Sequence, residues 1–231
     1  MNLNGVKALP SGNVIDLKAP DKYTFEVPEI ASLLGAVRRF NGWGVSVADH
    51  SVWVAHTLYL LTGNPHIALA GLFHDAQEGY IGDLSTPVKN LVGCEWDKLE
   101  YSINSEILSQ LHIKHKLNLC TMPLVKYIDM LALKNELEYL IELKRFIKDG
   151  QGVWDEVFKD VKPLTCSIDF RETDDPAETL KVVYLTYAKM AEDTSIEYVE
   201  CSYIAKDGNH SCMVATNKIT TFTDALGGEV C

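Results

Sequence analysis

The sequence predicts an all-α helical bundle with a small β appendage at its C-terminus. Apolar residues recur at helical spacing through most of the chain, and Pro and Gly separate the periodic segments. After residue 194 the pattern changes to β-branched and aromatic runs. Hydrophobic residues make up 47% of the 231 residues and charged residues 23%, which is typical of a globular core and argues against disorder.

Residues 1–27 contain several Pro and Gly residues and little periodicity, which predicts an irregular or short-strand lead-in. A first helix is predicted over 28–36, because Pro28 suits a first-turn position. Ser46 opens the next helix, and Asp49 three residues later makes a capping-box-like start.

Four further helices are predicted from apolar periodicity and from flanking Gly, Pro or acidic residues. They cover residues 66–80, 96–111, 123–148 and 176–191. A loop is predicted through Ser85-Thr86-Pro87, because Ser and Pro are typical turn residues.

The C-terminal segment predicts a β hairpin. Residues 196–204 and 213–222 have strand composition, and Asp207-Gly208 between them is a turn signal. We therefore divide the chain into a lead-in over 1–27, a helical core over 28–193 and a β appendage over 194–231.

The formal net charge of −11 disfavours duplex nucleic acid as a partner, because neutralising phosphates needs clustered Lys and Arg. A small anionic substrate stays compatible if a metal and a few cations reverse the sign of the charge inside a pocket. The apolar runs are too short to cross a bilayer, and the first residues do not form a signal peptide. Six cysteines without a CxxC pair suit a reducing cytosol, so we expect a cytoplasmic protein without a membrane partner.

Four side chains of metal-ligand type interrupt apolar helical segments. They are His50, His74, Asp75 and Asp129. A buried imidazole or carboxylate needs a partner, and a metal ion binds neutral His and ionised Asp together. The mixed set suits Mn, Fe, Co, Ni or Zn and is too rich in nitrogen for a dedicated Ca or Mg site. The alternative for His50 alone is a core histidine that is hydrogen-bonded to a carbonyl group.

Three motifs follow one another along the chain: VADHS over 47–51, LFHDAQE over 72–78 and GDLSTPVK over 82–89, with RRFNG over 38–42 before them. In this order they resemble the HD-domain phosphohydrolases. The similarity is closest to the bacterial 5′-deoxynucleotidases and their bacteriophage relatives, some of which hydrolyse deoxynucleoside triphosphates. It covers roughly residues 28–143 and implies an HD-domain helical core, and a host-cytoplasmic location if the protein is phage-encoded.

The resemblance also implies roles for individual residues. The four ligand-type side chains would hold one divalent transition metal, with additional Mg as an option. Glu78 and Asp83 match carboxylates that act on the attacking water and the scissile phosphate; Glu78, one helical turn after His74, would share a face with it. Substrate-binding candidates are Arg39, Phe40, Thr86, Lys89 and Lys126. For Lys89 and Lys126 the alternative is a solvated lysine, and for Thr86 it is turn chemistry.

Together these features predict a metal-dependent phosphoric monoester hydrolase that releases phosphate from deoxynucleoside 5′-monophosphates. The metal would activate the attacking water and neutralise charge on the phosphoryl group. Few basic residues flank the motifs, which favours this substrate over the alternative, a deoxynucleoside triphosphate triphosphohydrolase. A non-catalytic metal-binding regulatory module is the alternative from another class, and Glu78 and Asp83 argue against it. Related enzymes suggest a homo-oligomer.

Overall fold

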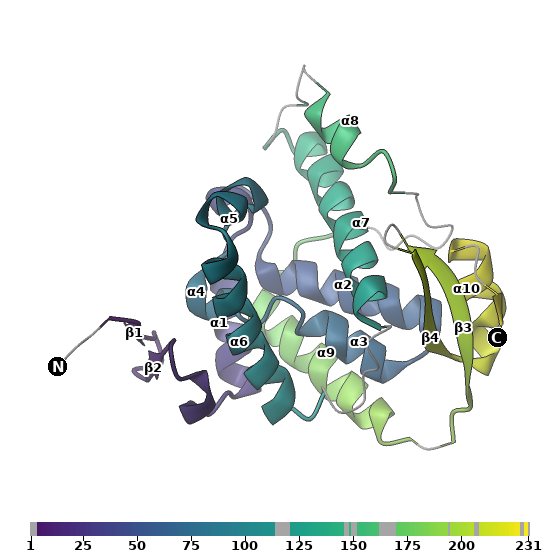
Figure 1. Cartoon of the computed structure of the whole chain (residues 1–231), viewed down its shortest axis with the longest axis horizontal. Coiled ribbons are helices and arrows are strands. Elements are labelled where there is room, and N and C mark those ends of the chain that lie inside the picture. Colours follow the sequence, from purple (N-terminus) through teal and green to yellow (C-terminus); the bar gives the residue numbers. More distant parts are fainter. Residues whose placement is uncertain are drawn as a thin grey trace.

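The computed structural model describes most of the chain (Figure 1). The described residues are 4–113, 121–145, 148, 152–161, 170–193, 195–205, 208–226 and 229–230. They are mostly helical, with one small antiparallel sheet near each end of the chain. The prediction of a helical bundle with a small β appendage is confirmed at this level.

The predicted lead-in contains regular structure. Strands β1 (Val6–Ala8) and β2 (Val14–Asp16) form an antiparallel hairpin, which a 3-10 helix, η1 (Pro20–Lys22), follows. Ile15 is fully buried, and the ammonium group of Lys7 donates a hydrogen bond to the carbonyl of Tyr80. These contacts anchor the hairpin to the helical part. The boundaries drawn at residues 27 and 194 stay predictions.

Helix α2 (Val47–Thr62) is the central helix of the bundle and is buried along most of its length. It contacts α1 (Val27–Ala36), α3 (Pro65–Leu72), α7 (Thr121–Glu142) and α9 (Pro176–Ala191). The predicted start is confirmed, because the Ser46 hydroxyl accepts a hydrogen bond from the backbone N–H of Asp49 at 2.9 Å. The helix ends at Gly63, whose φ of 61° suits a glycine cap.

Helices α2 and α3 approach each other closely at Gly71. A Cβ atom there would lie 2.4 Å from Leu58 Cδ1 and 3.1 Å from Val54 Cγ1, so a larger residue would push the helices apart. His74 follows Gly71 by one turn, whereas His50 lies on α2. The close approach therefore brings together the two segments that carry these histidines.

The predicted helix over 66–80 is wrong in its second half. Helix α3 ends at Leu72, turns occupy 73–77, and a short α4 (Glu78–Ile81) follows. The side-chain amide of Asn104, on α6 (Cys94–Gln110), donates to the carbonyls of Phe73 and His74 at 2.9 and 3.0 Å. These carbonyls at the end of α3 thus find a partner outside the helix, which local periodicity cannot reveal.

Three other segments, at 85–87, after 142 and at 153–157, differ clearly from the predictions. The loop predicted at 85–87 is instead the start of α5 (Thr86–Val92), with Pro87 in its first turn, where a missing N–H costs nothing. The helix predicted over 123–148 ends at Glu142, because Lys144 has φ 56° and Arg145 N–H bonds the carbonyl of Leu140. A short α8 (Val153–Val157) that was not predicted follows, and Figure 1 shows it beside the outer end of α7.

The predicted C-terminal hairpin is confirmed. Strands β3 (Tyr198–Ala205) and β4 (Gly208–Ala215) are antiparallel, and β5 (Glu229–Val230) pairs with β3. The predicted second strand over 213–222 is largely wrong, because β4 begins earlier, at Gly208, and ends at Ala215. Residues 219–222 lie in α10 (Ile219–Leu226), where Phe222 is buried. Asn64, just past α2, donates to the Met213 carbonyl at 3.1 Å. The appendage thus packs at the end of α2 opposite to His50, about 20 Å away along the helix.

Across the described ranges, no helix is both long enough and apolar enough to span a bilayer.

Candidate metal centre

The structure brings together the four side chains of metal-ligand type. His50 lies on the first turn of α2, His74 and Asp75 lie in the turn after α3, and Asp129 lies on α7. One donor atom from each lies within 4.8 Å of all the others. His50 Nε2 is 3.1 Å from Asp129 Oδ1 and 3.3 Å from His74 Nε2, which is itself 3.1 Å from Asp75 Oδ2. Ligands at metal-bond length from one ion are about 3.0–3.6 Å apart, so these distances fit a single metal.

The hydrogen bonds of the two histidines direct both Nε2 atoms toward the cluster. His74 Nδ1 is 2.7 Å from the Gly71 carbonyl oxygen, and His50 Nδ1 contacts the Glu136 carboxylate. Both partners accept hydrogen bonds, so in each neutral ring Nδ1 carries the proton and Nε2 carries a lone pair. Two lone pairs and two carboxylates then face one another. A cation between these groups would satisfy all four of them, and the donor set fits a divalent transition metal.

The electrostatics of the cluster favour positive charge. Burial alone would lower the pKa of His74, but Asp75 and Asp129 raise it well above its ordinary value. Burial alone would raise the pKa of Asp75, but the neighbouring imidazole of His74 lowers it to about 2. The two histidines likewise hold the pKa of Asp129 well below its usual range despite burial. Protons and metal ions compete for such a site, so metal binding depends on pH.

Glu136, which the sequence reasoning missed, completes the surroundings of the centre. It lies on α7 and is fully buried. One carboxylate oxygen contacts His50 Nδ1, and the other is 2.9 Å from Arg39 Nε. Burial alone would raise the pKa of Glu136, but the neighbouring Arg39 and His50 bring that pKa below its ordinary value. The available signal was its position two helical turns after Asp129, on the same face of an apolar helix.

A tight loop turns Arg39 inward. The Arg39 N–H bonds the Val45 carbonyl at 2.9 Å, and the Gly44 N–H bonds the Arg39 carbonyl at 2.8 Å. Gly44 must be glycine, because a Cβ there would lie 2.6 Å from the Phe40 ring. Phe40 has φ 52°, a strained conformation for a bulky residue. Arg39 is buried, with Nη1 3.6 Å from Asp75 Oδ2.

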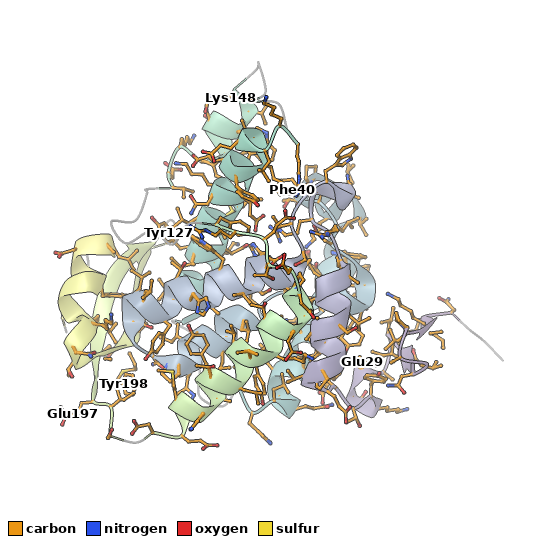
Figure 2. The ribbon with its side chains drawn as sticks, turned by 180° about the vertical axis from the view of Figure 1, so that it is seen from behind. Glu29, Phe40, Tyr127, Lys148, Glu197 and Tyr198 are labelled. Atoms are coloured by element: carbon orange, nitrogen blue, oxygen red, sulfur yellow. The ribbon has the colours of Figure 1, made fainter. Side chains whose placement is uncertain are left out.

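Phe40 is half-buried beside Arg39. Figure 2 shows it on the side of the bundle from which the outer part of α7 rises. The Phe40 ring packs over Gly44, in the same tight loop that carries Arg39.

Glu78 is buried at the start of α4, so the expectation that it shares a helical face with His74 is wrong. Its Oε1 is 3.3 Å from Lys89 Nζ, whereas Oε2 has no hydrogen-bond partner among the described residues. Burial, Asp75 and Asp83 raise the pKa of Glu78 well above its ordinary value. Burial and the charge of Asp75 also raise the pKa of Asp83. The nearby positive charges of Arg39 and Lys89 act in the opposite direction but do not cancel this increase.

The other substrate-binding candidates lie farther out. Lys89 forms ion pairs with Glu78 and, at 2.7 Å, with Glu100, and these carboxylates raise its pKa despite burial. Thr86 is the exposed first residue of α5, and Lys126 is exposed on α7. Within the described residues, the hydrogen bonds and ion pairs of the cluster involve neither of them.

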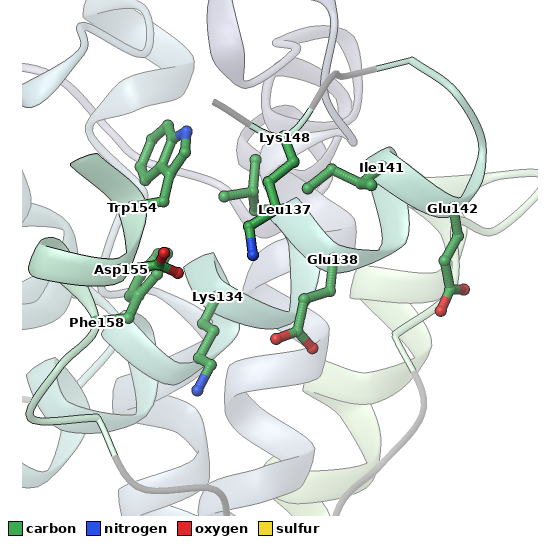
Figure 3. Close-up of a pocket in the computed structure, with 9 residues that line it drawn as sticks. All are labelled: Lys134, Leu137, Glu138, Ile141, Glu142, Lys148, Trp154, Asp155 and Phe158. Carbon is green, nitrogen blue, oxygen red and sulfur yellow. The ribbon is translucent and has the colours of Figure 1, made fainter. Parts of the chain in front are cut away.

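A groove of about 470 Å³ lies between α7 and α8 (Figure 3). Its lining mixes apolar, acidic and basic side chains, namely Lys134, Leu137, Glu138, Ile141, Glu142, Lys148, Trp154, Asp155 and Phe158. The predicted site residues do not line it, so it is separate from the candidate metal centre.

Comparison with known proteins gives partial similarity. No family model matches the chain. An uncharacterised protein of Rhodobacter capsulatus is 35% identical over 106 residues, which is 42% of this chain and 53% of that protein. Proteins named 5′-deoxynucleotidase from Vibrio atlanticus and Photobacterium profundum are 38% and 34% identical over 80 residues, in both cases 29% of this chain and 41% of the relative. The chain thus spans about half of the length of these curated relatives, or less.

Proposed function

We propose that this protein is an HD-type, metal-dependent phosphohydrolase that releases phosphate from deoxynucleoside 5′-monophosphates. The observation that carries the proposal is the convergence of two imidazoles and two carboxylates on one point, next to a buried glutamate and a buried arginine. The partial similarity to two proteins named 5′-deoxynucleotidase supports a nucleotide as the substrate class.

His50, His74, Asp75 and Asp129 would hold one divalent ion of Co, Mn, Zn, Fe or Ni. When bound, such an ion supplies Lewis acidity toward the phosphate and the attacking water. The cluster also suits a phosphohydrolase because buried carboxylates outnumber buried cations around it, and a divalent ion offsets this excess.

Glu78 would accept the proton of the attacking water. Lys89 engages Oε1, which leaves the buried Oε2 for that proton. The elevated pKa of Glu78 suits a carboxylate that must hold a proton during turnover. Asp83, whose pKa is also raised, would give its own proton to the leaving oxygen of the nucleoside. The proton that Glu78 has taken from the water would then pass to Asp83, so that both carboxyl groups are restored after each turnover.

Arg39 would bind the phosphate. The Nε–H group of Arg39 donates to Glu136, and the terminal guanidinium nitrogens of Arg39 keep N–H donors for phosphate oxygens. Phe40, next to it, offers an aromatic face to the sugar or base. Lys89 is already paired with two carboxylates. The local positive charge thus balances one phosphate group better than three, which favours the monophosphate.

The test is to incubate metal-loaded protein with deoxynucleoside mono- and triphosphates, and to measure inorganic phosphate and tripolyphosphate separately. We expect phosphate from the monophosphates. Release of tripolyphosphate would replace the proposed substrate with a triphosphate. A lack of turnover with Mn, Co and Zn would overturn the enzyme proposal and favour a binding module. The Glu78→Gln variant should keep its metal and lose turnover.

A homo-oligomer, a cytoplasmic location and the exclusion of duplex nucleic acid stay predictions from the sequence.

A further inference from the structure

Glu136 uses both oxygens of one buried carboxylate for two different parts of the candidate site. Oε1 contacts Nδ1 of His50, on α2. Oε2 lies 2.9 Å from Nε of Arg39, in the loop before α2. The side chain is fully buried, so water does not compete for either contact. Both partners lie far from Glu136 in sequence, which makes the contacts tertiary.

We propose that Glu136 is a positioning residue that links metal binding to phosphate binding by holding His50 and Arg39 at once. The phosphate-binding half of this inference rests on the function proposed above, whereas the metal-binding half does not.

The contact with His50 sets the protonation of the imidazole. A carboxylate oxygen that accepts a hydrogen bond from Nδ1 keeps the proton on that nitrogen, so the lone pair of Nε2 faces His74, Asp75 and Asp129. The same contact stops rotation of the ring. Without it, the tautomer with a proton on Nε2 would become accessible, and that proton would point at the place of the metal.

The contact with Arg39 prevents a competing ion pair. Arg39 Nη1 is already 3.6 Å from Asp75 Oδ2, and Asp75 is a proposed metal ligand. Because Glu136 engages Nε at the shorter distance of 2.9 Å, the guanidinium is held away from a full pairing with Asp75. Asp75 keeps its charge for the metal, and Arg39 keeps its terminal N–H groups for the phosphate.

The chain contains a matched control. Glu172 also uses its two carboxylate oxygens for two partners, with Oε1 2.9 Å from Arg38 Nη1 and Oε2 2.8 Å from Arg145 Nη1. These arginine side chains are 46% and 41% exposed, and the ion pairs lie outside the metal-ligand cluster. The same substitution at Glu172 therefore tests the loss of a bridging carboxylate without touching the site.

The key variant is Glu136→Gln, which preserves shape but has one acceptor where the carboxylate has two. Its NH₂ group must face either His50 Nδ1 or Arg39 Nε, both of which donate in the native protein. We expect metal affinity, measured by competition with a chromophoric chelator for Zn, to fall about 10–100-fold. We also expect the KM for deoxyadenosine 5′-monophosphate to rise, while Glu172→Gln matches the wild type in both.

A second pair of variants separates the two halves. In an Arg39→Met background, adding Glu136→Gln should raise KM no further but should still weaken metal binding. Glu136→Asp keeps two acceptor oxygens and should recover part of the metal affinity. It also serves as the test if Glu136→Gln does not fold, which far-UV circular dichroism would show.

Metal affinity and KM at wild-type values in a folded Glu136→Gln variant would overturn the proposal and leave Glu136 as a core carboxylate. If the wild type hydrolyses no nucleotide, the proposed function fails. Loss of metal affinity in Glu136→Gln, but not in Glu172→Gln, would then still support the His50 half. Binding of deoxyadenosine 5′-monophosphate, measured by calorimetry, would decide the Arg39 half.

Discussion

Arg38 and Arg39 are neighbours in sequence, and each contacts a glutamate that also contacts a second side chain. Glu172 joins Arg38 to Arg145 in what we call the outer bridge, and Glu136 joins Arg39 to His50 in the inner bridge. Arg38, whose side chain is 46% exposed, reaches Glu172, which is 19% exposed, whereas Arg39 reaches the fully buried Glu136. The backbone here is extended, with Arg38 in a β-bridge to Ser46, so successive side chains point to opposite sides. One backbone conformation thus produces an outer and an inner charge bridge with the same chemistry.

The two bridges differ in energy because they differ in exposure. An exposed ion pair contributes about 0–1 kcal/mol, since water already solvates both charges. Removing one partner of a buried pair costs about 3–5 kcal/mol, because the other charge stays buried. A buried pair is nevertheless a weak source of stability compared with apolar residues of the same size. The inner bridge is therefore better explained by what it positions than by what it stabilises.

The largest expected effect breaks this comparison directly. Arg39→Met should lower the free energy of unfolding by about 3–5 kcal/mol, because Glu136 then keeps only His50 as a partner. Arg38→Met should change it by less than about 1 kcal/mol. Urea titrations of both variants measure the difference. Equal losses would mean that burial does not distinguish the two bridges.

The second largest effect should come from metal binding to the cluster of His50, His74, Asp75 and Asp129, which should stabilise the folded protein. At a free metal concentration of about 100 times Kd, we expect the free energy of unfolding to rise by about 2.7 kcal/mol. His74→Ala should abolish the increase, because it removes one of the four proposed ligands. Thermal unfolding with and without chelator measures this increase, and the control variant Glu172→Gln should show the same increase as the wild type. An unchanged increase in His74→Ala would contradict the site assignment.

A smaller effect should come from the helix packing that supports the inner region. Gly71→Ala would place a methyl group 2.4 Å from Leu58 Cδ1, and we expect a loss of about 1–3 kcal/mol together with weaker metal binding. Gly35→Ala is the control, since the nearest neighbour of the added methyl group would be Ala177 on α9, 3.2 Å away, and not the helix that carries His50. Chelator competition should show that Gly35→Ala binds metal normally. If Gly71→Ala also binds metal normally, helix spacing does not set the distance between the histidines.

The smallest expected effect concerns salt. Exposed charges are screened within about 3 Å at 1 M ionic strength, and buried pairs much less. The small destabilisation caused by Glu172→Gln should therefore shrink in 1 M NaCl, whereas that of Glu136→Gln should persist. Unfolding titrations at low and high salt provide the measurement. Equal salt sensitivity would indicate that water reaches the inner bridge.

The same contrast explains what could be predicted from the sequence. His50, His74, Asp75 and Asp129 were recognisable because each interrupts an apolar stretch, and the start of α2 was recognisable because Ser46 is a local capping signal. Their convergence is a finding of the structure, and their role as ligands stays a prediction.

The parts that could not be predicted depend on residues distant in sequence. The carbonyl groups at the end of α3 bond Asn104 on another helix, and the contacts of Glu136 are with partners at positions 39 and 50. Residues 219–222 have strand composition but form α10, because their surroundings override weak local propensity. Local patterns thus located the polar residues, while tertiary contacts decided what they touch.

The order of the site residues along the chain has a consequence for protein synthesis. Arg39, His50, His74 and Asp75 leave the ribosome first, and α7 delivers Asp129 and Glu136 later. Helix α9, which packs against α1, α2 and α3, emerges after every one of them. A chain stalled after residue 145 would carry all the proposed ligands but lack helix α9, which packs against the core. We expect such a nascent chain to retain metal poorly, and to capture it firmly only once α9 has emerged.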